Sequence, residues 1–500
     1  MRSNSGEIFI SVSLVYPDFA PSGNPPLGLA YVAAILEKNG INVNIVDCSF
    51  LSPEKVVPSI LKNNPIIVGI SATTLLYPNA LKIAREVKKR SSVPICIGGP
   101  HPTIFPEEVV SDPDIDFVVL GEGELSFLEL VKSLMTHEDF ENVPGIGFSK
   151  RGSVVINPPR LPIENLDLLP FPARHLLPMD VHIGFNFLYY GKPATTMIAS
   201  RGCPFNCSFC QPTLRKIFGR KSRRRSPENV VDEIEYLIKK YDIKLIIFHD
   251  DTFTLNRKWV MDVCDEIIKR NLKIKWICNS RADTLDERLL KKLKEAGCVE
   301  LRIGVESGNQ WILDNILKKG ITINQVRDTF KLIRKCGFKR AWAFFMVGSP
   351  GETRDMIQDS IRLAREIKPT HVNISITLPL PGTELWNIAG KYGSFDKDWS
   401  KYDYAEDHAI IDTPLLPKHE VEEMARKFRI EFMEQEKLRF KMSIISHAFQ
   451  YVIWALYRSL LNRDIKPLAT SVKLIYNLTR SFLRYHTFRL SRYHMPKEKI

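Results

Sequence analysis

Three cysteines within eight residues constrain this chain of 500 residues more than any other feature. Residues 200–212 read Ser-Arg-Gly-Cys-Pro-Phe-Asn-Cys-Ser-Phe-Cys-Gln-Pro, so that Cys203, Cys207 and Cys210 are spaced C-x3-C-x2-C. Three thiols so close together cannot all pair as disulfides, but they can converge on one metal centre. Structural zinc normally takes four protein ligands, and no further His or Cys follows nearby. The alternative is a chance cluster of buried cysteines.

An iron–sulfur cubane suits this donor set better than zinc does. Such a cluster normally takes four thiolates, so three leave one iron open to a ligand that is not protein. The stretch resembles the signature of the radical S-adenosylmethionine (SAM) enzymes, including the aromatic Phe209 before the last cysteine. The resemblance implies that Cys203, Cys207 and Cys210 hold a 4Fe-4S cluster and that SAM binds at the open iron.

Residues 1–156 show strand signals that alternate with helix signals, which predicts an α/β domain with a doubly wound parallel sheet. The expected strands cover residues 8–15, 43–46, 66–71, 94–97 and 117–120. Ligands of such sheets bind at the carboxyl ends of the strands. Small or polar residues stand at three of these ends and are the candidate ligand contacts: Ser71, Thr73, Gly98, Gly99, Gly121 and Glu122.

This first domain resembles the cobalamin-binding domain that precedes the barrel in one radical SAM class. No G-x-G-x-x-G follows the first strand, so a dinucleotide is not expected. The loop at residues 16–24 also lacks the D-x-H-x-x-G motif whose histidine takes the cobalt. His101 is the one histidine near a strand end of this domain, and a loop-stabilising hydrogen bond is the alternative role for it. A cofactor-free scaffold is the alternative for the whole domain.

A Pro-rich linker over 157–192 leads to a second run of alternating strands and helices over 193–390. Strands are expected at 195–200, 245–248, 273–279, 300–305, 341–347 and 371–377, which predicts a partial (βα)6 barrel. Barrel active sites gather at the carboxyl ends of strands, and the cysteine stretch follows the first strand. A helical extension is expected over 391–436 and a basic helical tail over 437–500.

The resemblance also implies a role for residues at the other strand ends. The backbone beside Phe209 would contact adenine, and Asp250 and Asp251 stand where the family contacts the SAM ammonium, although its Gly-Gly-Glu is absent here. Arg281 could pair with the SAM carboxylate, and Glu306, followed by Ser307, could accept ribose hydroxyls. Gly348 and Gly351 would let adenine lie against the chain. For Asp250, Arg281 and Glu306, the alternative is an ion pair inside the barrel.

The positive charge of the chain is concentrated at its C-terminal end. Of the net charge of +13, residues 437–500 carry +11, from thirteen Lys or Arg and two Asp or Glu. A body so close to neutral is not expected to bind nucleic acid. Residues 223–225, three consecutive arginines, are expected to form a basic patch, solvated or near the cluster, without a catalytic role.

The tail admits two interpretations. The uncharged run over 442–457 has 16 residues, fewer than the roughly 20 that span a bilayer. The segment 468–490 is basic and amphipathic, which is typical of helices that lie on anionic membranes. A helical cap over the barrel is the alternative. No signal peptide is visible, so we expect a cytoplasmic enzyme, with peripheral contact to the membrane if the first interpretation holds.

Taken together, the sequence favours a radical SAM enzyme that abstracts hydrogen from an unactivated carbon for cobalamin-dependent methyl transfer. A radical SAM cyclase or carbon–carbon coupling enzyme with a structural first domain is one alternative. A non-catalytic iron–sulfur or membrane scaffold protein is another. The expected partners are a small-molecule or lipid substrate and an electron donor such as flavodoxin or ferredoxin, and the expected cofactors are the 4Fe-4S cluster, SAM and cobalamin.

Overall fold

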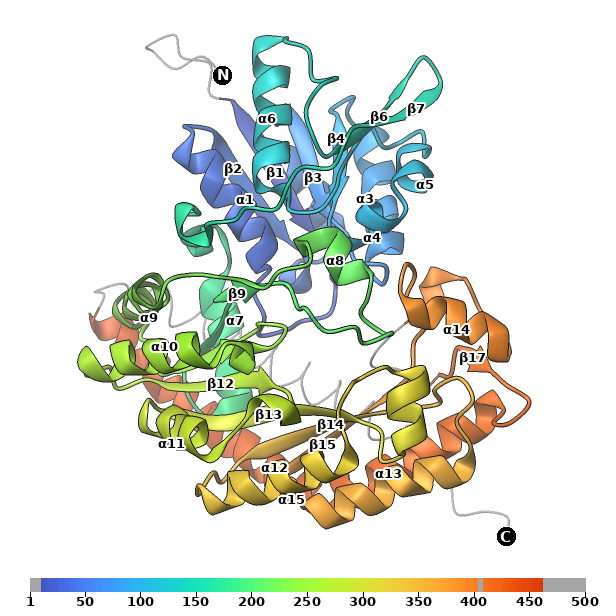
Figure 1. Ribbon diagram of the computed structural model, residues 1–500. Helices are drawn as coiled ribbons and strands as arrows, with labels where there is room; N and C mark the ends of the chain where they lie inside the picture. Colours follow the sequence, from blue (N-terminus) through green and yellow to red (C-terminus); the bar gives the residue numbers. More distant parts are fainter. Residues whose placement is uncertain (1–9, 403–407, 462–500) are drawn as a thin grey trace.

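The computed structural model describes residues 10–402 and 408–461 as two stacked α/β bodies (Figure 1). The N-terminal body lies above a wider body built on the second sheet. The segment that joins them runs down one side, and α8 (Thr213–Phe218) lies between the two. The start of the first expected strand and the segment 468–490 fall outside the described residues.

The N-terminal body is a seven-stranded sheet in the order β2-β1-β3-β4-β5-β6-β7. The first five strands are parallel, as predicted. Apolar residues of β1, such as Leu14 and Val15, alternate between two cores, one under α1 and α6 and the other under α2, α3 and α5. The strands are β1 Ser11–Tyr16, β2 Asn42–Asp47, β3 Ile67–Ser71, β4 Ile95–Gly98, β5 Phe117–Val119, β6 Ile146–Lys150 and β7 Ser153–Ile156. The helices are α1 Leu27–Lys38, α2 Pro53–Leu61, α3 Tyr77–Lys88, α4 Pro100–Ile104, α5 Pro106–Val110 and α6 Gly123–Thr136.

The hairpin β6–β7 was not predicted. It extends the sheet with antiparallel pairing beyond β5. Its second strand is exposed or half-buried, and a turn at Arg151-Gly152 joins the strands with both residues at positive φ. A short, half-exposed edge strand carries little of the apolar signal from which a buried strand is recognised.

The linker passes along the first body and then forms a helix, α7 (Met179–Tyr190). The Pro-rich part contains only single turns, at Leu166–Leu168 and Arg174–Leu176. Arg174 is buried at the junction, where it pairs with Glu233 at 2.8 Å and donates to the carbonyl of Thr196. The linker therefore packs into the body rather than only wrapping its outside.

The second body contains the predicted half-barrel, a parallel six-stranded sheet in the order β15-β14-β13-β12-β11-β8. Ser226 is the N-cap of α9, and its side chain accepts from the backbone N–H of Asn229. The sheet strands are β8 Ala194–Met197, β11 Leu245–Phe248, β12 Lys275–Ser280, β13 Cys298–Glu306, β14 Ala341–Val347 and β15 His371–Ile376. The helices after them are α9 Pro227–Tyr241, α10 Arg257–Lys269, α11 Glu287–Glu295, α12 Ile323–Lys335, α13 Arg354–Ile367 and α14 Glu384–Tyr392. Two-residue strands form the pairs β9 (Ser200–Arg201) with β10 (Arg223–Arg224) and β16 (Ser394–Phe395) with β17 (Ile411–Asp412).

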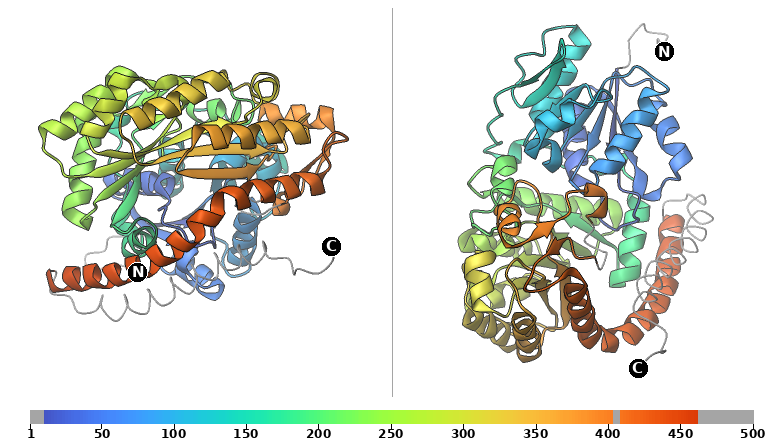
Figure 2. Two further views of the ribbon diagram at one scale, coloured as in Figure 1. Left: turned by 90° about the horizontal axis from the view of Figure 1, so that it is seen from below. Right: turned by 90° about the vertical axis from the view of Figure 1, so that its right-hand side faces the viewer.

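One long helix, α15 (Lys418–Leu461), runs from the open edge of the half-barrel to α7 on its other side (Figure 2). It covers the edge strand β15, where Arg429 donates to the carbonyl of Ile374 at 3.0 Å. Further along, Tyr451 and Trp454 pack on Phe187 of α7. The helix crosses residue 436 without a break, so the expected boundary between extension and tail is not visible there. Within the described residues, no helix is both long and apolar enough to cross a bilayer.

Candidate active site

The cysteine loop lies at the carboxyl end of the half-barrel and lines a cavity of about 300 Å³. All three cysteines border it, together with Phe209, Arg281 and other groups from the strand ends. The remaining lining residues are Phe205, Gln211, Leu214, Asp251, Thr252, Asn279, Ser280, Arg302, Gly304, Glu306, Lys319 and Phe344. Four strand ends therefore meet around the thiols, as the sequence predicted for a barrel mouth.

Two cations adjoin the thiol of Cys207. Arg281 donates through Nη1 to its sulfur at 3.6 Å, and its guanidinium lies 3.6 Å from the ring centroid of Phe205. Lys319 is buried and binds Glu306 at 2.6 Å. Burial raises the pKa of the Cys207 thiol, and Lys319 and Arg281 oppose that shift. Metal replaces the thiol proton, so positive neighbours favour the liganding form.

The thiols fit a cluster better than one metal ion. Within the described residues, no three His, Cys, Asp or Glu side chains are close enough to hold a single ion. A cubane distributes its thiolate ligands over different irons, and three thiols facing one cavity suit it. Burial also raises the pKa of the Cys210 thiol. The donor set therefore fits an iron–sulfur cluster, with Cys203, Cys207 and Cys210 as its ligands.

Only some of the predicted SAM contacts line this cavity. Phe209, Asp251, Arg281 and Glu306 line the cavity, whereas the other four predicted contacts do not: Asp250, Ser307, Gly348 and Gly351. The Asp250 carboxylate is buried, accepts from Ala199 N–H at 3.2 Å and from the Ser200 hydroxyl, and has its pKa raised to about 7 by burial. Ser307 is fully buried and accepts from Asn309 N–H.

The two glycines serve packing in this structure. Gly348 and Gly351 have positive φ, and a Cβ there would meet Val421 and Tyr392. The alternative role of Arg281 and Glu306 was an ion pair inside the barrel. In the structure Arg281 pairs with Asp283, and Glu306 pairs with Lys319. The expected SAM contacts of all these residues remain predictions.

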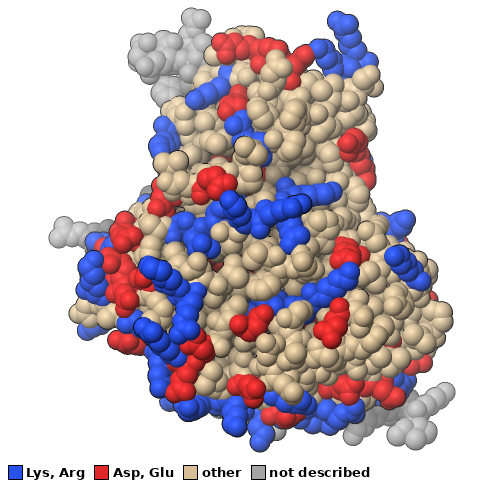
Figure 3. Space-filling model, viewed as in Figure 1, with Lys and Arg blue, Asp and Glu red and all other residues tan. Residues whose placement is uncertain are grey.

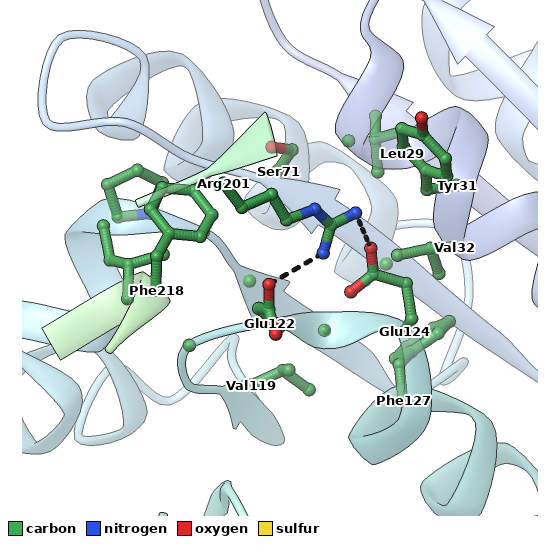
Figure 4. Close-up of a pocket in the computed structure, with 18 of the residues that line it drawn as sticks. Leu29, Tyr31, Val32, Ser71, Val119, Glu122, Glu124, Phe127, Arg201 and Phe218 are labelled. Atoms are coloured by element: carbon green, nitrogen blue, oxygen red, sulfur yellow. Dashed lines mark hydrogen bonds and ion pairs between the residues drawn. The ribbon is translucent and has the colours of Figure 1, made fainter. Parts of the chain in front are cut away.

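A second cavity, of about 280 Å³, lies between the two bodies at the carboxyl ends of β1, β3, β4 and β5 (Figure 4). Ser71, Gly98, Gly99, Gly121 and Glu122 line it, and Thr73 does not. A Cβ at Gly28 would meet nothing within 4 Å, which leaves room for a flat ligand along this wall. His101 lies outside the lining; its Nδ1 contacts the Thr74 hydroxyl at 3.2 Å, the loop-stabilising hydrogen bond that was the alternative.

An ion-pair network joins this cavity to the cysteine loop. Arg201, two residues before Cys203, binds Glu122 at 2.9 Å and Glu124 at 2.5 Å (Figure 4). Arg223 also binds Glu122 at 2.9 Å, and all four side chains are at most 9% exposed. Burial alone would raise the pKa of Glu122, but Arg223 and Arg201 hold it below its usual range. Glu122 thus fixes the cysteine loop to the N-terminal body.

The two cavities meet at Asp251, which lines both. Asp251 is exposed to the cavities, but desolvation by the surrounding protein raises the pKa of its carboxyl group, and the Gly202 N–H opposes the shift. His249, on the same strand end, also lines the cavity between the bodies. A reacting group held at Asp251 would therefore have access to both cavities.

Sequence reasoning missed several of these groups. Lys319 lies in a Lys-Lys-Gly turn, which reads as ordinary surface, and Arg201 was counted only as part of the cysteine stretch. The partner of Arg201 lies 79 residues earlier in the chain, so no local pattern reveals it. His249 precedes the predicted contacts Asp250 and Asp251 but was given no role from the sequence.

Family models match both bodies. The radical SAM superfamily model covers residues 197–364, and the B12 binding domain model covers residues 20–131. An uncharacterized methyltransferase of Pyrococcus horikoshii is 36% identical over 434 residues, which cover 85% of this chain and 91% of that protein. This chain belongs to the radical SAM enzymes that carry a B12-binding domain. The family prediction and the predicted fold class are thus confirmed.

A second relative has another printed activity. The anaerobic magnesium-protoporphyrin IX monomethyl ester cyclase of Rubrivivax gelatinosus is 33% identical, over 79% of this chain and 72% of that protein. Among solved structures, the cobalamin-dependent SAM radical enzyme OxsB matches with a TM-score of 0.68 at 18% identity, over 96% of this chain and 75% of that one. The methyltransferase TsrM of Kitasatospora setae matches with a TM-score of 0.66 at 19% identity, over 84% and 83%. These structures share the fold.

Proposed function

We propose that this radical SAM enzyme transfers a methyl group to an unactivated carbon of a small-molecule substrate. The observation that carries the proposal is the arrangement of two cavities that meet at Asp251, one lined by three thiols and the other by the strand ends of a B12-binding domain. When bound, the cluster and SAM supply the carbon radical and cobalamin supplies the methyl group.

The residues of the chain position these groups and exclude water. Cys203, Cys207 and Cys210 would hold the cluster, with Arg281 and Lys319 as cations beside it. The glycine-lined wall between the bodies would hold the corrin, without a histidine from the N-terminal body. Asp251 would orient the substrate between the two, because this residue lines both cavities.

Cyclisation is the second candidate, because the Rubrivivax relative is a cyclase by its printed name. The two reactions differ in the fate of the methyl group. Protein purified anaerobically from a cobalamin-rich culture is incubated with reductant and SAM labelled in its methyl group. We expect iron, cobalt and label on the protein-bound cobalamin, together with 5′-deoxyadenosine. Cleavage of SAM by protein that carries no cobalt would favour cyclisation instead.

The packing of the C-terminal helix bears on the class of substrate. A lipid substrate and surface contact with an anionic membrane were both inferred from the tail. Tyr451 and Trp454, two of the aromatic residues on which that inference depended, pack on α7 in the structure. This contact favours the helical cap over the membrane for residues 418–461. The support for a small-molecule substrate is the size of the two cavities that meet at Asp251, about 280 and 300 Å³.

A further inference from the structure

The segment that follows the cysteine loop is strongly basic. Residues 215–225 contain seven Lys or Arg and no Asp or Glu. Arg223 and Arg225 are buried and pair with Glu122 and Glu233. The other five form what we term the basic surface, and none of them has an ion pair within the described residues: Arg215, Lys216, Arg220, Lys221 and Arg224. Lys216, Arg220 and Lys221 are exposed, and the remaining two are half-buried.

The basic surface lies directly on the cysteine loop. Helix α8 begins three residues after Cys210, and Leu214 N–H donates to the carbonyl of Cys210 at 3.2 Å. Arg215 donates through Nη2 to the carbonyl of Pro204 at 2.9 Å. Figure 3 shows Lys and Arg side chains gathered across the waist of the molecule, over α8. An electron that arrives at this surface is separated from the thiols by little more than the loop itself.

We propose that the basic surface is the docking site of a small acidic electron carrier of the flavodoxin class. The proposal rests on the proposed function, because it requires a cluster that accepts an electron. One electron passes from the reduced flavin of the carrier to the oxidised cluster, so the carrier is oxidised by one electron and the cluster is reduced by one. No bond forms or breaks, and no proton needs to enter the buried loop.

Charge complementarity identifies the partner. Opposite charge around a docking site raises association rates by about 10- to 1000-fold at low ionic strength. Residues 1–436 carry a net charge of only about +2, so these five cations are a local concentration rather than part of a generally basic body. Nucleic acid is the other polyanion to consider. The one aromatic residue of the segment 215–225, Phe218, is half-buried and lines the cavity between the two bodies, so it is not offered on the surface to stack on a base.

The test compares two triple variants in stopped-flow reduction of the reconstituted enzyme. Lys216→Glu/Arg220→Glu/Lys221→Glu reverses the exposed charges of the basic surface. Lys273→Glu/Lys275→Glu/Lys339→Glu is the matched control, because these exposed lysines precede or begin β12 and β14, at the opposite end of the barrel strands. Each protein is mixed anaerobically with reduced flavodoxin at about 0.02 M and about 0.5 M salt, and separately with dithionite.

We expect the surface variant to be reduced by flavodoxin at least about tenfold more slowly than wild type at low salt. The difference should shrink at high salt, and dithionite should reduce all three proteins alike. Equal flavodoxin rates for the two variants would overturn the proposal, as would a wild-type enzyme that dithionite reduces and flavodoxin does not. If wild type and the control variant bind a DNA duplex, the surface variant does not, and flavodoxin reduces all three at equal rates, the basic surface is a site for nucleic acid. A protein without a reducible cluster would instead refute the proposed function itself.

Discussion

Replacing Glu122 by Gln should weaken the attachment of the cysteine loop to the N-terminal body. Glu122 is 4% exposed, and its carboxylate binds Arg201, Arg223 and the N–H of Ile163. The amide of Gln has the same size but no charge, so two buried guanidinium groups lose a shared counter-ion. Breaking a buried ion pair from one side costs about 3–5 kcal/mol. Arg201 keeps Glu124, which places the expected loss toward the lower end of that range.

The measurement is urea unfolding of the two proteins without cofactors. Glu129→Gln is the matched control, because Glu129 lies on α6, the helix that Glu122 precedes as N-cap, and pairs with Arg160, but is 45% exposed. An exposed pair is worth at most about 1 kcal/mol, so this variant should stay close to wild type. If Glu122→Gln also unfolds within about 1 kcal/mol of wild type, the network does not hold the two bodies together.

The pH dependence provides an independent check. The pKa of Glu122 is lower in the folded protein than in the unfolded chain, where it is about 4.3. The Glu122 carboxylate therefore makes its full contribution to the free energy of unfolding above the unfolded pKa of about 4.3. This contribution is lost as the pH falls through the folded pKa. Glu122→Gln should remove this part of the acid sensitivity, so the gap between variant and wild type should narrow at low pH. A gap that widens in acid would refute the assignment.

Three further predictions concern individual groups of the site. Arg281→Met should make the reduction potential of the cluster more negative, because a cation and an N–H donor to the Cys207 sulfur are lost; an EPR-monitored redox titration that shows no shift would contradict this. His101→Ala should leave the absorption spectrum of bound cobalamin unchanged, because His101 packs on Tyr77 outside the cavity; a spectral change would identify it as a cobalt ligand. Asp250 has a folded pKa of about 7 against about 3.9 unfolded, so it costs stability as the pH rises between these values. Asp250→Asn should weaken that pH dependence in urea unfolding, and an unchanged slope would count against the assignment.

Much of the site could be predicted because strand ends in parallel sheets meet at one edge. Applied to the sequence alone, that rule groups Cys203, Phe209, Arg281 and Glu306 at one barrel mouth, and all four line one cavity in the fold. The same rule groups Gly98, Gly99 and Glu122, which line the other cavity. It could not say what each side chain binds, because this depends on partners distant in the chain.

The features that could not be predicted depend on contacts between residues distant in the sequence. Glu122 was expected to contact a cofactor, yet its carboxylate is occupied by Arg201 and Arg223, which only the fold brings to it. Helix α15 was divided at residue 436 because its charge pattern changes there, but both halves bury apolar residues against the body. Charge composition alone does not show which face of a helix is covered.

The most direct test of the central claim is the iron content and SAM cleavage of the cysteine variants. We expect the reconstituted wild type to bind about four irons per chain and to form 5′-deoxyadenosine from SAM under reducing conditions. Cys203→Ala, Cys207→Ala and Cys210→Ala should each abolish cleavage. Cys264→Ala and Cys336→Ala should not, because these two thiols lie outside the cavity. A triple variant at residues 203, 207 and 210 that kept both its iron and its cleavage activity would contradict the account.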